Sequence, residues 1–303
     1  MAAGRIAIGV DVGGSGIKAA VVDVEVGTIR SDRLRVPTPV PSTPDAINAS
    51  IARLVKRLVT ATGLGPTTPV GVGLPGVTID GHVRTASNID PGWLDFPERE
   101  RLSRMLLRPI AIVNDADAAG IAEMRFGMGK DRPGTVIFLT LGTGVGSGIF
   151  HDGVLVPNTE FGQMEIRGRP AERRSAAVAR TRRGLSWKAW AADLDEHLQA
   201  IDTLLWPNLL ILGGGVSKNA DRFIPRLTVR PPVVAATLRN DAGIIGAAIV
   251  AVEQGVTAGP LGEETVPAVT TSARPVGASA NGTEPGATTA TPTPDTASRG
   301  PEK

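Results

Sequence analysis

The chain has 303 residues, 42% of them hydrophobic and 3% aromatic, with a formal net charge of +2 and no cysteine. The lack of cysteine excludes disulfide bonds and cysteine-ligated zinc, and the shortage of aromatic rings argues against a stacking surface for single-stranded nucleic acid. No apolar run approaches the roughly 18 residues of a membrane span and no leader precedes the first apolar segment, so we expect a cytoplasmic protein that binds neither nucleic acid nor membrane.

The first predicted element is a β-hairpin with a glycine-rich turn, IAIGVDVGGSGIKAAVVDVEVG, at residues 6 to 27. Its glycines fit the spacing of a dinucleotide-binding fingerprint, but that fingerprint requires a helix after the turn, and the valine-rich residues 19 to 26 are typical of a strand. Lys18 is not followed by Ser or Thr, so the turn is not a Walker A loop. Glycines reach positive φ and let backbone N–H groups close on an anion, which favours a phosphate site over an ordinary hairpin turn. The expected phosphate-binding residues are Asp11, Gly13, Gly14, Ser15, Gly16 and Lys18.

Asp11 stands directly ahead of this turn. It can hold Mg²⁺ through water, because Mg²⁺ keeps much of its hydration shell while it bridges phosphate oxygens. A buried capping aspartate is the alternative. None of the three histidines falls in a motif, so no histidine metal site is expected.

Hydrophobic periodicity predicts a helix at 45–62, a strand at 69–73 with a turn at 74–76, a strand at 110–113 and a helix at 116–126. Asn114 and Asp115 stand between the last two elements. Both are preferred helix caps. A carboxylate at this point can also accept the proton of a hydroxyl group that attacks a phosphoryl group. Both roles hold if one residue caps the helix and the other reacts.

A second glycine-rich hairpin, TVIFLTLGTGVGSGIFHDGVL, occupies residues 135 to 155, 129 residues after the first. Its turn is expected to bind phosphate in the same way. Two such turns imply two domains that face one phosphate chain. The expected residues of the second turn are Gly142, Thr143 and Gly144.

A polar cluster follows the second hairpin and encloses Phe161 and Gly162, which is unusual for a solvated acidic surface. Carboxylates and a carboxamide are suitable hydrogen-bond partners for the neighbouring hydroxyls of a sugar. Asn88, in the segment RTASNIDPGW, could bind the same sugar from the other domain. The cluster consists of Glu160, Gln163, Glu165 and Glu172.

Residues 167 to 188 form a basic segment with eight Lys or Arg residues and one acidic residue, Glu172. A solvated basic helix is the plain interpretation. The segment begins next to the expected sugar ligands, however, and a linear polyanion such as polyphosphate would gain charge-assisted hydrogen bonds and release counterions there. The expected polyphosphate-binding residues are Arg173, Arg174, Arg182 and Arg183.

The remaining pattern predicts a helix at 186–205, a strand at 209–212 that runs into a triple-glycine segment, and a helix at 242–253. Alternating strands and helices indicate an α/β fold with a sheet in each half. We expect an N-terminal domain at 1–114 and a C-terminal domain at 115–254, leaving open whether the last helix packs back on the first domain. Residues 255–303 are rich in Pro, Gly, Thr and Ala, and we expect them to be disordered.

Eight motifs in order make the chain similar to the ROK family of sugar kinases over residues 6 to 252, namely DVGGSGIK, LPGV, RTASNIDPGW, VNDADAAG, LGTGVGSG, NTEFGQMEI, GGGVS and NDAGIIGAA. The resemblance is strongest to the branch of the family that uses polyphosphate. It implies an actin-like ATPase fold of two α/β domains around a cleft, with phosphoryl transfer to the 6-hydroxyl of glucose. Mg²⁺ as cofactor, polyphosphate or ATP as donor, and a homodimer are implied as well.

The resemblance also assigns roles to single residues. Asp115 matches the catalytic base, and the two glycine turns match the phosphate loops. The sugar ligands are matched by Asn88, Asn114, Glu160 and Glu172, and the loop near a nucleotide is matched by Gly213, Gly214 and Gly215.

The chain departs from the family where E-x-G-H is usual, because Gln163 takes the place of the histidine. Glutamine still donates and accepts hydrogen bonds, but its reach differs. The chain also lacks the cysteine-rich zinc motif that many members of the family carry. The polyphosphate branch lacks this motif too, so no structural zinc is expected. A strictly ATP-dependent hexokinase acting on glucose or mannose, and a weakly active sugar sensor, remain as alternatives. A sugar-responsive DNA-binding regulator is disfavoured, since the fold begins at residue 5 or 6.

Overall fold

The computed structural model describes residues 5–85 and 90–254, all within one compact unit that spans residues 1–261. Asn88 and the expected disordered tail, residues 255–303, lie outside the described residues. The boundary expected between residues 114 and 115 stays a prediction. No helix in the described ranges has the length and apolar character needed to cross a membrane.

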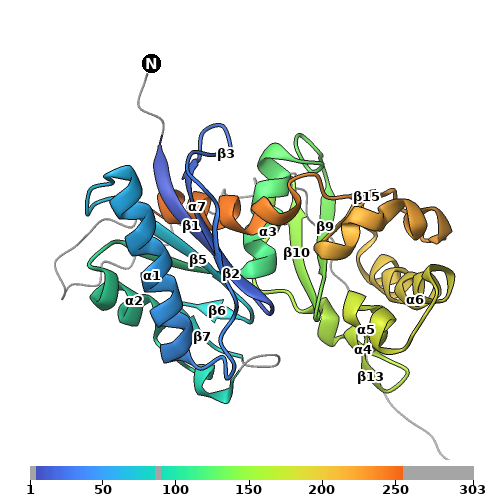
Figure 1. Ribbon diagram of the computed structural model, residues 1–303. Coiled ribbons are helices and arrows are strands. Elements are labelled where there is room, and N and C mark those ends of the chain that lie inside the picture. The colour runs from blue at the N-terminus through green and yellow to red at the C-terminus, as the bar shows by residue number, and fades with distance from the viewer. Residues whose placement is uncertain (1–4, 86–89, 255–303) are drawn as a thin grey trace, which may run out of the picture. The chain divides into compact units, whose positions relative to one another are not determined.

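The N-terminal half is built on a six-stranded sheet in the order β3-β2-β1-β5-β8, in which β4 pairs with the first residues of β2, next to the hairpin turn (Figure 1). The predicted first hairpin is confirmed, since β1 and β2 pair antiparallel from Ile6 with Asp23 to Gly13 with Gly16. β1, β5 and β8 run parallel. The strands are β1 (Ile6–Gly13), β2 (Gly16–Asp23), β3 (Thr28–Ile29), β4 (Leu34–Val36), β5 (Val70–Leu74) and β8 (Ile110–Asn114).

Two helices pack on this sheet and bury an aliphatic core with it. The predicted helix α1 (Pro44–Thr62) begins at the N-cap Thr43 and ends at Gly63, which has a positive φ. Helix α2 (Glu98–Leu106) was not predicted, because its sequence ERERLSRML is mostly charged and Pro97 provides no side-chain cap. Two short pieces, β6 (Thr78–Ile79) with β7 (His82–Val83) and the 3₁₀ turn η1 (Pro91–Trp93), complete this half.

The C-terminal half carries a five-stranded sheet in the order β11-β10-β9-β14-β15, and its hairpin β9-β10 confirms the second predicted glycine hairpin. The long helix α6 (Trp187–Leu205) follows its N-cap Ser186 and packs on this sheet through Trp190, Leu194 and Leu198. The strands are β9 (Thr135–Leu141), β10 (Val145–His151), β11 (Val154–Val156), β14 (Leu209–Gly213) and β15 (Val233–Ala235). The smaller elements are η2 (Phe161–Gln163), β12 (Glu165–Ile166), β13 (Arg169–Pro170), α4 (Glu172–Ser175), α5 (Ala177–Arg182), η3 (Gly215–Arg222), η4 (Ile224–Arg226) and η5 (Arg239–Asp241).

Helices α3 (Asp115–Phe126) and α7 (Ala242–Glu253) lie between the two sheets, and one core cluster joins residues of both sheets with both helices (Figure 1). Helix α7 packs on the first sheet and on α3 so closely that backbone atoms are in contact. A Cβ on Gly71 would lie 1.8 Å from the carbonyl oxygen of Ala247, and a Cβ on Gly246 would lie 1.6 Å from that of Ala118. Side chains larger than hydrogen are therefore excluded at both positions.

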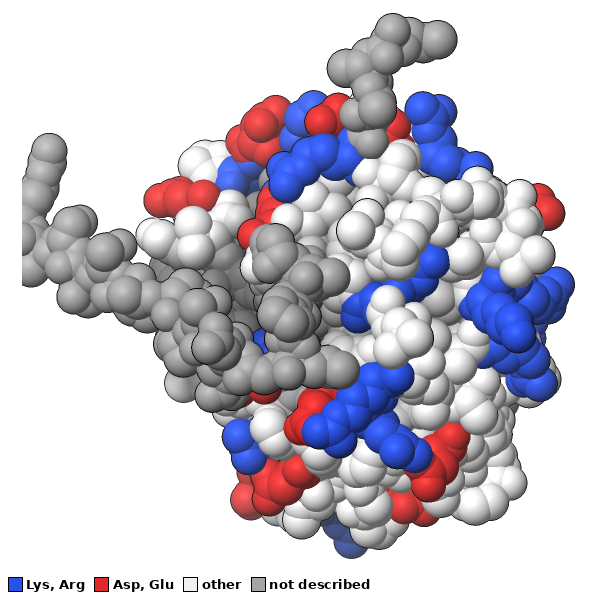
Figure 2. Space-filling view, turned by 90° about the vertical axis from the view of Figure 1, so that its left-hand side faces the viewer, with Lys and Arg blue, Asp and Glu red and all other residues white. Residues whose placement is uncertain are grey.

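On the face that includes α1 and α2, basic and acidic side chains are interspersed, with uncharged surface between them (Figure 2). The positive segment expected to bind a polyanion is located in the other half of the chain, at residues 167 to 188.

Candidate active site between the two glycine turns

The two glycine turns lie against each other. A Cβ on Gly14 would lie 3.2 Å from the side-chain oxygen of Thr143, so the turn of the first hairpin faces the turn of the second. The segment around β4 supports the first turn, because Arg35 donates to the carbonyl oxygen of Ser15 at 2.8 Å. The structure thus brings together the two turns that were expected to bind one phosphate chain.

Asp11 and Lys18 face each other across the first hairpin, with Lys18 Nζ 2.8 Å from Asp11 Oδ2. The start of α7 also approaches, since a Cβ on Gly243 would lie 2.9 Å from Asp11 Cγ. The described residues contain no group of three or more His, Cys, Asp or Glu side chains arranged to hold a metal. A single carboxylate beside a phosphate loop still suits Mg²⁺, which is commonly bound by one or two carboxylates together with water and substrate phosphates.

Asn114 is the N-cap of α3. Its Oδ1 accepts hydrogen bonds from the backbone N–H groups of Ala116 and Asp117, and its Nδ2 donates to the carbonyl oxygen of Gly76 at 3.0 Å. Asn114 therefore orients the first turn of α3. One of its amide hydrogens is left for a substrate, so the expected sugar contact stays a prediction.

Asp115 is the first residue of α3, directly after the buried strand β8. The pKa of Asp115 is raised to about 7, first by burial of the carboxyl and then by the nearby carboxylates of Asp11, Glu160 and Asp117, against a lowering hydrogen bond from the backbone of Ala116. A carboxyl group with a pKa near neutrality is suited to accept a proton at physiological pH. Asp115 lies between the first glycine turn and the polar cluster, because the charges of Asp11 and of Glu160 both act on its carboxyl.

The polar cluster forms around Glu172 at the start of α4. Glu172 accepts a hydrogen bond from Gln163 Nε2 at 3.0 Å and another from the backbone N–H of Val145 at 3.1 Å. The pKa of Glu160 is raised by burial and then by the charge of Glu172. The structure thus brings Glu160, Gln163 and Glu172 together beside the start of β10, whereas Glu165 is exposed on β12.

Three residues that the sequence analysis did not select hold the loop that carries this cluster. Asp117 accepts from the backbone N–H of Asn158 at 2.8 Å, and Ser147 Oγ donates to Thr159 O at 2.7 Å and accepts from Phe161 N at 3.0 Å. The carboxyl of Asp117 is buried, which raises its pKa to about 7. Its position two residues after Asp115 was the only sequence signal.

His197 on α6 is the third of these residues. It is buried, with Nε2 3.0 Å from the carbonyl oxygen of Phe161 and Nδ1 2.9 Å from Ser175 Oγ. Burial lowers the pKa of His197, and its Nε2 faces a carbonyl oxygen, so Nε2 carries the ring proton and donates to Phe161. The Ser175 hydroxyl beside Nδ1 also lies 2.9 Å from the carbonyl oxygen of Ala171. His197 therefore ties the turn of Gln163 to the helix of Glu172, although no sequence motif marked it.

The basic segment is partly neutralised by α6. Arg174 forms ion pairs with Asp193 and with Glu196, and Arg183 lies 2.6 Å from the same Asp193. Arg173 and Arg182 form no ion pair within residues 5–85 and 90–254. The four-arginine polyphosphate site stays a prediction. Arg173 and Arg182 are the two members whose charge is not paired with a carboxylate of the described residues, so they would contribute most to binding a polyanion.

The triple-glycine segment lies beside the second phosphate turn. Gly214, at the end of β14, has a φ of 82°, and a Cβ on it would lie 2.4 Å from the carbonyl oxygen of Leu141, which directly precedes Gly142. Gly213 and Gly215 flank it at the start of η3. A nucleotide role for this segment stays a prediction.

Comparison with known proteins agrees with the geometry. A model of the ROK family matches residues 7–164. The polyphosphate glucokinase of Mycobacterium tuberculosis (strain CDC 1551 / Oshkosh) is 45% identical over 249 residues, covering 82% of this chain and 92% of that protein. The crystal structure of inorganic polyphosphate/ATP-glucomannokinase from Arthrobacter sp. strain KM matches with a TM-score of 0.81 at 45% identity, covering 82% of this chain and 99% of that one.

A ROK family glucokinase from Streptomyces griseus, solved in complex with glucose and AMPPNP, matches with a TM-score of 0.71 at 26% identity, over 82% of this chain and 99% of that one. The expected actin-like ATPase fold is confirmed by these structural matches.

Proposed function

The chain belongs to the ROK family, and on that premise we propose that it transfers a phosphoryl group from inorganic polyphosphate, and also from ATP, to the 6-hydroxyl of glucose. One observation carries this proposal. The pKa of Asp115 is raised to about 7, and its carboxyl lies near two other carboxylates, Asp11 at the first phosphate turn and Glu160 in the polar cluster. A proton acceptor between an anion site and a hydroxyl-binding site is the arrangement that phosphoryl transfer to an alcohol requires.

The reaction follows from these positions. Asp115 accepts the proton of the 6-hydroxyl as its oxygen forms a bond to the terminal phosphorus of the donor, and the bond from that phosphorus to the bridging oxygen breaks. The shortened donor leaves with the electron pair. The backbone N–H groups of the two turns and Lys18 stabilise the charge on the phosphate oxygens.

Glu160, Gln163 and Glu172 are proposed to bind the sugar hydroxyls, together with Asn114. Asn88 belongs to the same proposal but lies outside the described residues. Mg²⁺ is proposed to bind at Asp11 through water and to neutralise phosphate charge when it is present. Lys18 already pairs with Asp11, so the metal and the ammonium would share this carboxylate.

Polyphosphate as donor is supported by two relatives that are each 45% identical to this chain, a polyphosphate glucokinase and a polyphosphate/ATP-glucomannokinase. The purified chain is to be assayed with glucose and either long-chain polyphosphate or ATP, with glucose 6-phosphate as the measured product. Turnover with ATP alone would show a strictly ATP-dependent hexokinase. Glucose binding without turnover on either donor would show a sensor.

The homodimer implied by the family resemblance is also a proposal. β11 forms one edge of the second sheet and exposes two apolar side chains, Val154 at 70% and Val156 at 48%. Exposed apolar edge strands are favoured sites of association. Sedimentation equilibrium tests the proposal, and a monomer at all concentrations would contradict it.

A further inference from the structure

Asn158 joins the two halves of the chain. It lies on the loop after β11, in the second half, and its side chain makes two hydrogen bonds with Thr78 of β6, in the first half. Asn158 Oδ1 accepts from the backbone N–H of Thr78 at 2.8 Å, and Asn158 Nδ2 donates to the carbonyl oxygen of Thr78 at 3.0 Å. Because a backbone N–H only donates and a carbonyl oxygen only accepts, both ends of the amide are fixed.

The backbone of Asn158 is held by a third element, α3. Its N–H donates to Asp117 Oδ2 at 2.8 Å, and Asp117 is only 1% exposed. The φ of Asn158 is 61°, in the left-handed region that asparagine tolerates better than most other non-glycine residues. One residue therefore bonds at the same time to β6 of the first half and to the first turn of α3, which also carries Asp115.

This contact fixes one end of the segment that carries Glu160. Glu160 follows Asn158 by two residues. The other end is fixed at Phe161, whose N–H donates to Ser147 Oγ of β10 at 3.0 Å. Glu160 is thus held between two anchored residues, and the anchor at Asn158 refers its position to the same helix turn as Asp115.

Hydrogen bonds rather than close packing hold the anchor at Asn158. A cavity of about 580 Å³ lies next to it, and the described side chains leave this space open. A loop released from its hydrogen bonds could therefore shift without a steric clash. The cavity lining includes Thr78, Asp117 and Asn158 together with apolar side chains such as Ile121, Phe150 and Leu155.

We propose that Asn158 is a positioning residue for the sugar, which sets the distance between Glu160 and Asp115 by bonding to Thr78 and Asp117 at once. The inference rests on the proposed function, because Glu160 is a sugar ligand only under that proposal. A ligand that loses its fixed position binds its substrate more weakly in the ground state and in the transition state alike. The effect should therefore appear in the affinity for glucose more than in kcat.

Asn158→Gly tests this role. Glycine removes the amide but adopts a positive φ without strain, and it keeps the N–H that bonds to Asp117. We expect Kd and KM for glucose to rise by about tenfold, whereas kcat should fall by less than about threefold and KM for the phosphoryl donor should change by less than about twofold. A fall in kcat with an unchanged Kd for glucose would overturn the inference.

Asp117→Ala releases the same loop from α3 and leaves the Asn158 amide in place. It should also weaken glucose binding by about tenfold. If both contacts set one distance, the double variant Asn158→Gly/Asp117→Ala should bind glucose no more than about threefold less tightly than the weaker single variant. Effects that multiply, to about a hundredfold, would show two independent roles and contradict the inference.

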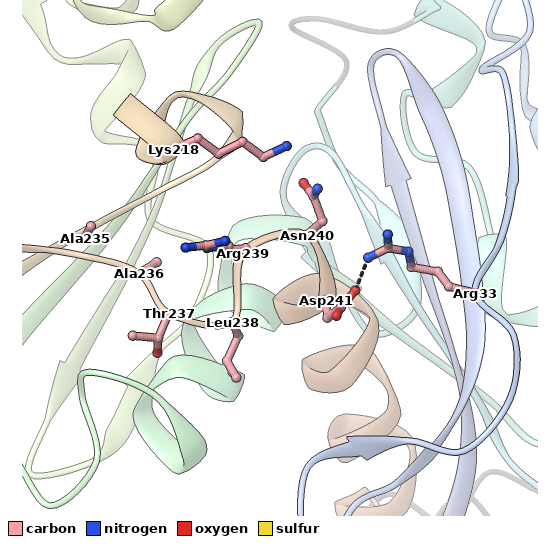
Figure 3. A pocket seen from close by; sticks show the side chains of 9 residues that line it. All are labelled: Arg33, Lys218, Ala235, Ala236, Thr237, Leu238, Arg239, Asn240 and Asp241. Atoms are coloured by element: carbon pink, nitrogen blue, oxygen red, sulfur yellow. Dashed lines mark hydrogen bonds and ion pairs between the residues drawn. The ribbon is translucent and has the colours of Figure 1, made fainter. Parts of the chain in front are cut away.

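Two variants with matched losses serve as controls. Asp152 also has a positive φ, 48°, and its Oδ1 accepts from Gly134 N at 2.7 Å, but both residues belong to the second half. Arg33 pairs with Asp241, which is far from it in the chain, and both side chains are exposed (Figure 3). Asp152→Gly and Arg33→Gln should leave Kd for glucose within about twofold of the wild type. A tenfold rise in either would show that any loosening weakens sugar binding, and would overturn the role of Asn158.

Titration calorimetry with glucose alone separates this inference from the proposed function. If the wild type binds glucose but transfers no phosphoryl group, and Asn158→Gly binds glucose about tenfold less tightly, then the proposed reaction fails and the positioning role stands. If Asn158→Gly binds glucose as the wild type does and only its melting temperature falls, Asn158 has a structural role and the inference is wrong, whatever the turnover. A wild type that binds no glucose would overturn both.

Discussion

At the scale of single residues, Asp115 decides the pH dependence of the proposed reaction. Its pKa is raised to about 7 by burial first and by Asp11 next, and the base must be ionised to take a proton. We therefore expect kcat/KM to rise with pH and to level off above about pH 7, because kcat/KM reports the free enzyme. A profile that is flat between about pH 5 and pH 8 would remove Asp115 from the base role.

Asp115→Asn should lower kcat by roughly 10² to 10⁴, because the amide cannot accept the hydroxyl proton. The fold and glucose binding should persist, since the cap of α3 is supplied by Asn114. Steady-state turnover assays measure kcat, and calorimetric titration with glucose measures sugar binding. A variant that keeps more than about a third of the wild-type kcat would contradict the assignment.

Glu98 and Asn48 form a buried pair whose titration affects the stability of the fold rather than the reaction. Asn48 Nδ2 donates to Glu98 Oε2 at 2.9 Å, while Asn48 Oδ1 and Glu98 Oε1 are buried without a hydrogen-bond partner among the described residues. A proton on Glu98 removes the buried negative charge and gives the carboxyl a donor that the ionised form lacks. Burial raises the pKa of Glu98 from 4.5 to about 8, so the group is protonated at neutral pH in the folded state.

The folded protein thus holds this proton more tightly than the unfolded chain does. The stability that Glu98 contributes is complete below pH 4.5 and is lost as pH rises through about 8. Glu98→Gln keeps a donor and an acceptor without the charge. We expect it to be more stable than wild type by about 1–3 kcal/mol at roughly pH 9, with no such gain at roughly pH 4. Urea unfolding at both pH values measures this, and a gain that is independent of pH would contradict it.

At the scale of elements, η2 and α4 carry the proposed sugar ligands and are joined through His197. His197→Leu leaves the Phe161 carbonyl and the Ser175 hydroxyl without this partner. We expect KM for glucose to rise by about tenfold, with a smaller change in kcat, because the ligands lose their fixed spacing. His197→Gln supplies one donor and one acceptor and should restore most of the affinity. A lower melting temperature with an unchanged KM in His197→Leu would show a purely structural role.

The packing of α7 against α3 depends on a glycine. A Cβ at position 246 would lie 1.6 Å from the Ala118 carbonyl oxygen, which is backbone and cannot turn aside. Gly246→Ala should therefore destabilise the protein by about 1–3 kcal/mol or more, although alanine alone would favour the helix by about 1 kcal/mol. Gly65→Ala is the matched control, since nothing lies within 4 Å of its Cβ position. Equal unfolding free energies for the two variants would contradict this account.

At the scale of the whole molecule, the apolar clusters of the described residues reach Val252, and helix α7 ends at Glu253. The sequence of residues 262–303 is rich in Pro, Gly, Thr and Ala and has no aromatic residue. Removing residues 262–303 should therefore change the melting temperature by less than about 2 °C and leave kcat unchanged. A fall of more than about 5 °C in a thermal scan would mean that this segment contributes to the core.

Local pattern alone determined the two hairpins, α1, α3, α6 and α7, because strand and helix periodicity and glycine turns are properties of neighbouring residues. It also led to Asp115 and to the cluster of Glu160, Gln163 and Glu172, which are close in the chain. Helix α2 escaped detection because its charged sequence shows little periodic signal, and its stability comes from packing on α1 and β8.

Only the tertiary structure decided which charges are free and which carboxyls hold their protons. Arg174 and Arg183 meet Asp193 only because α4 and α5 fold onto α6. The pKa of Asp115 is raised because its carboxyl is buried and because β1 and the loop after β11 bring Asp11 and Glu160 near it. Electrostatic energy depends on distance in space and on exposure to solvent. Sequence spacing fixes neither, so the contacts of His197 and Asp117 with the site became visible only in the folded chain.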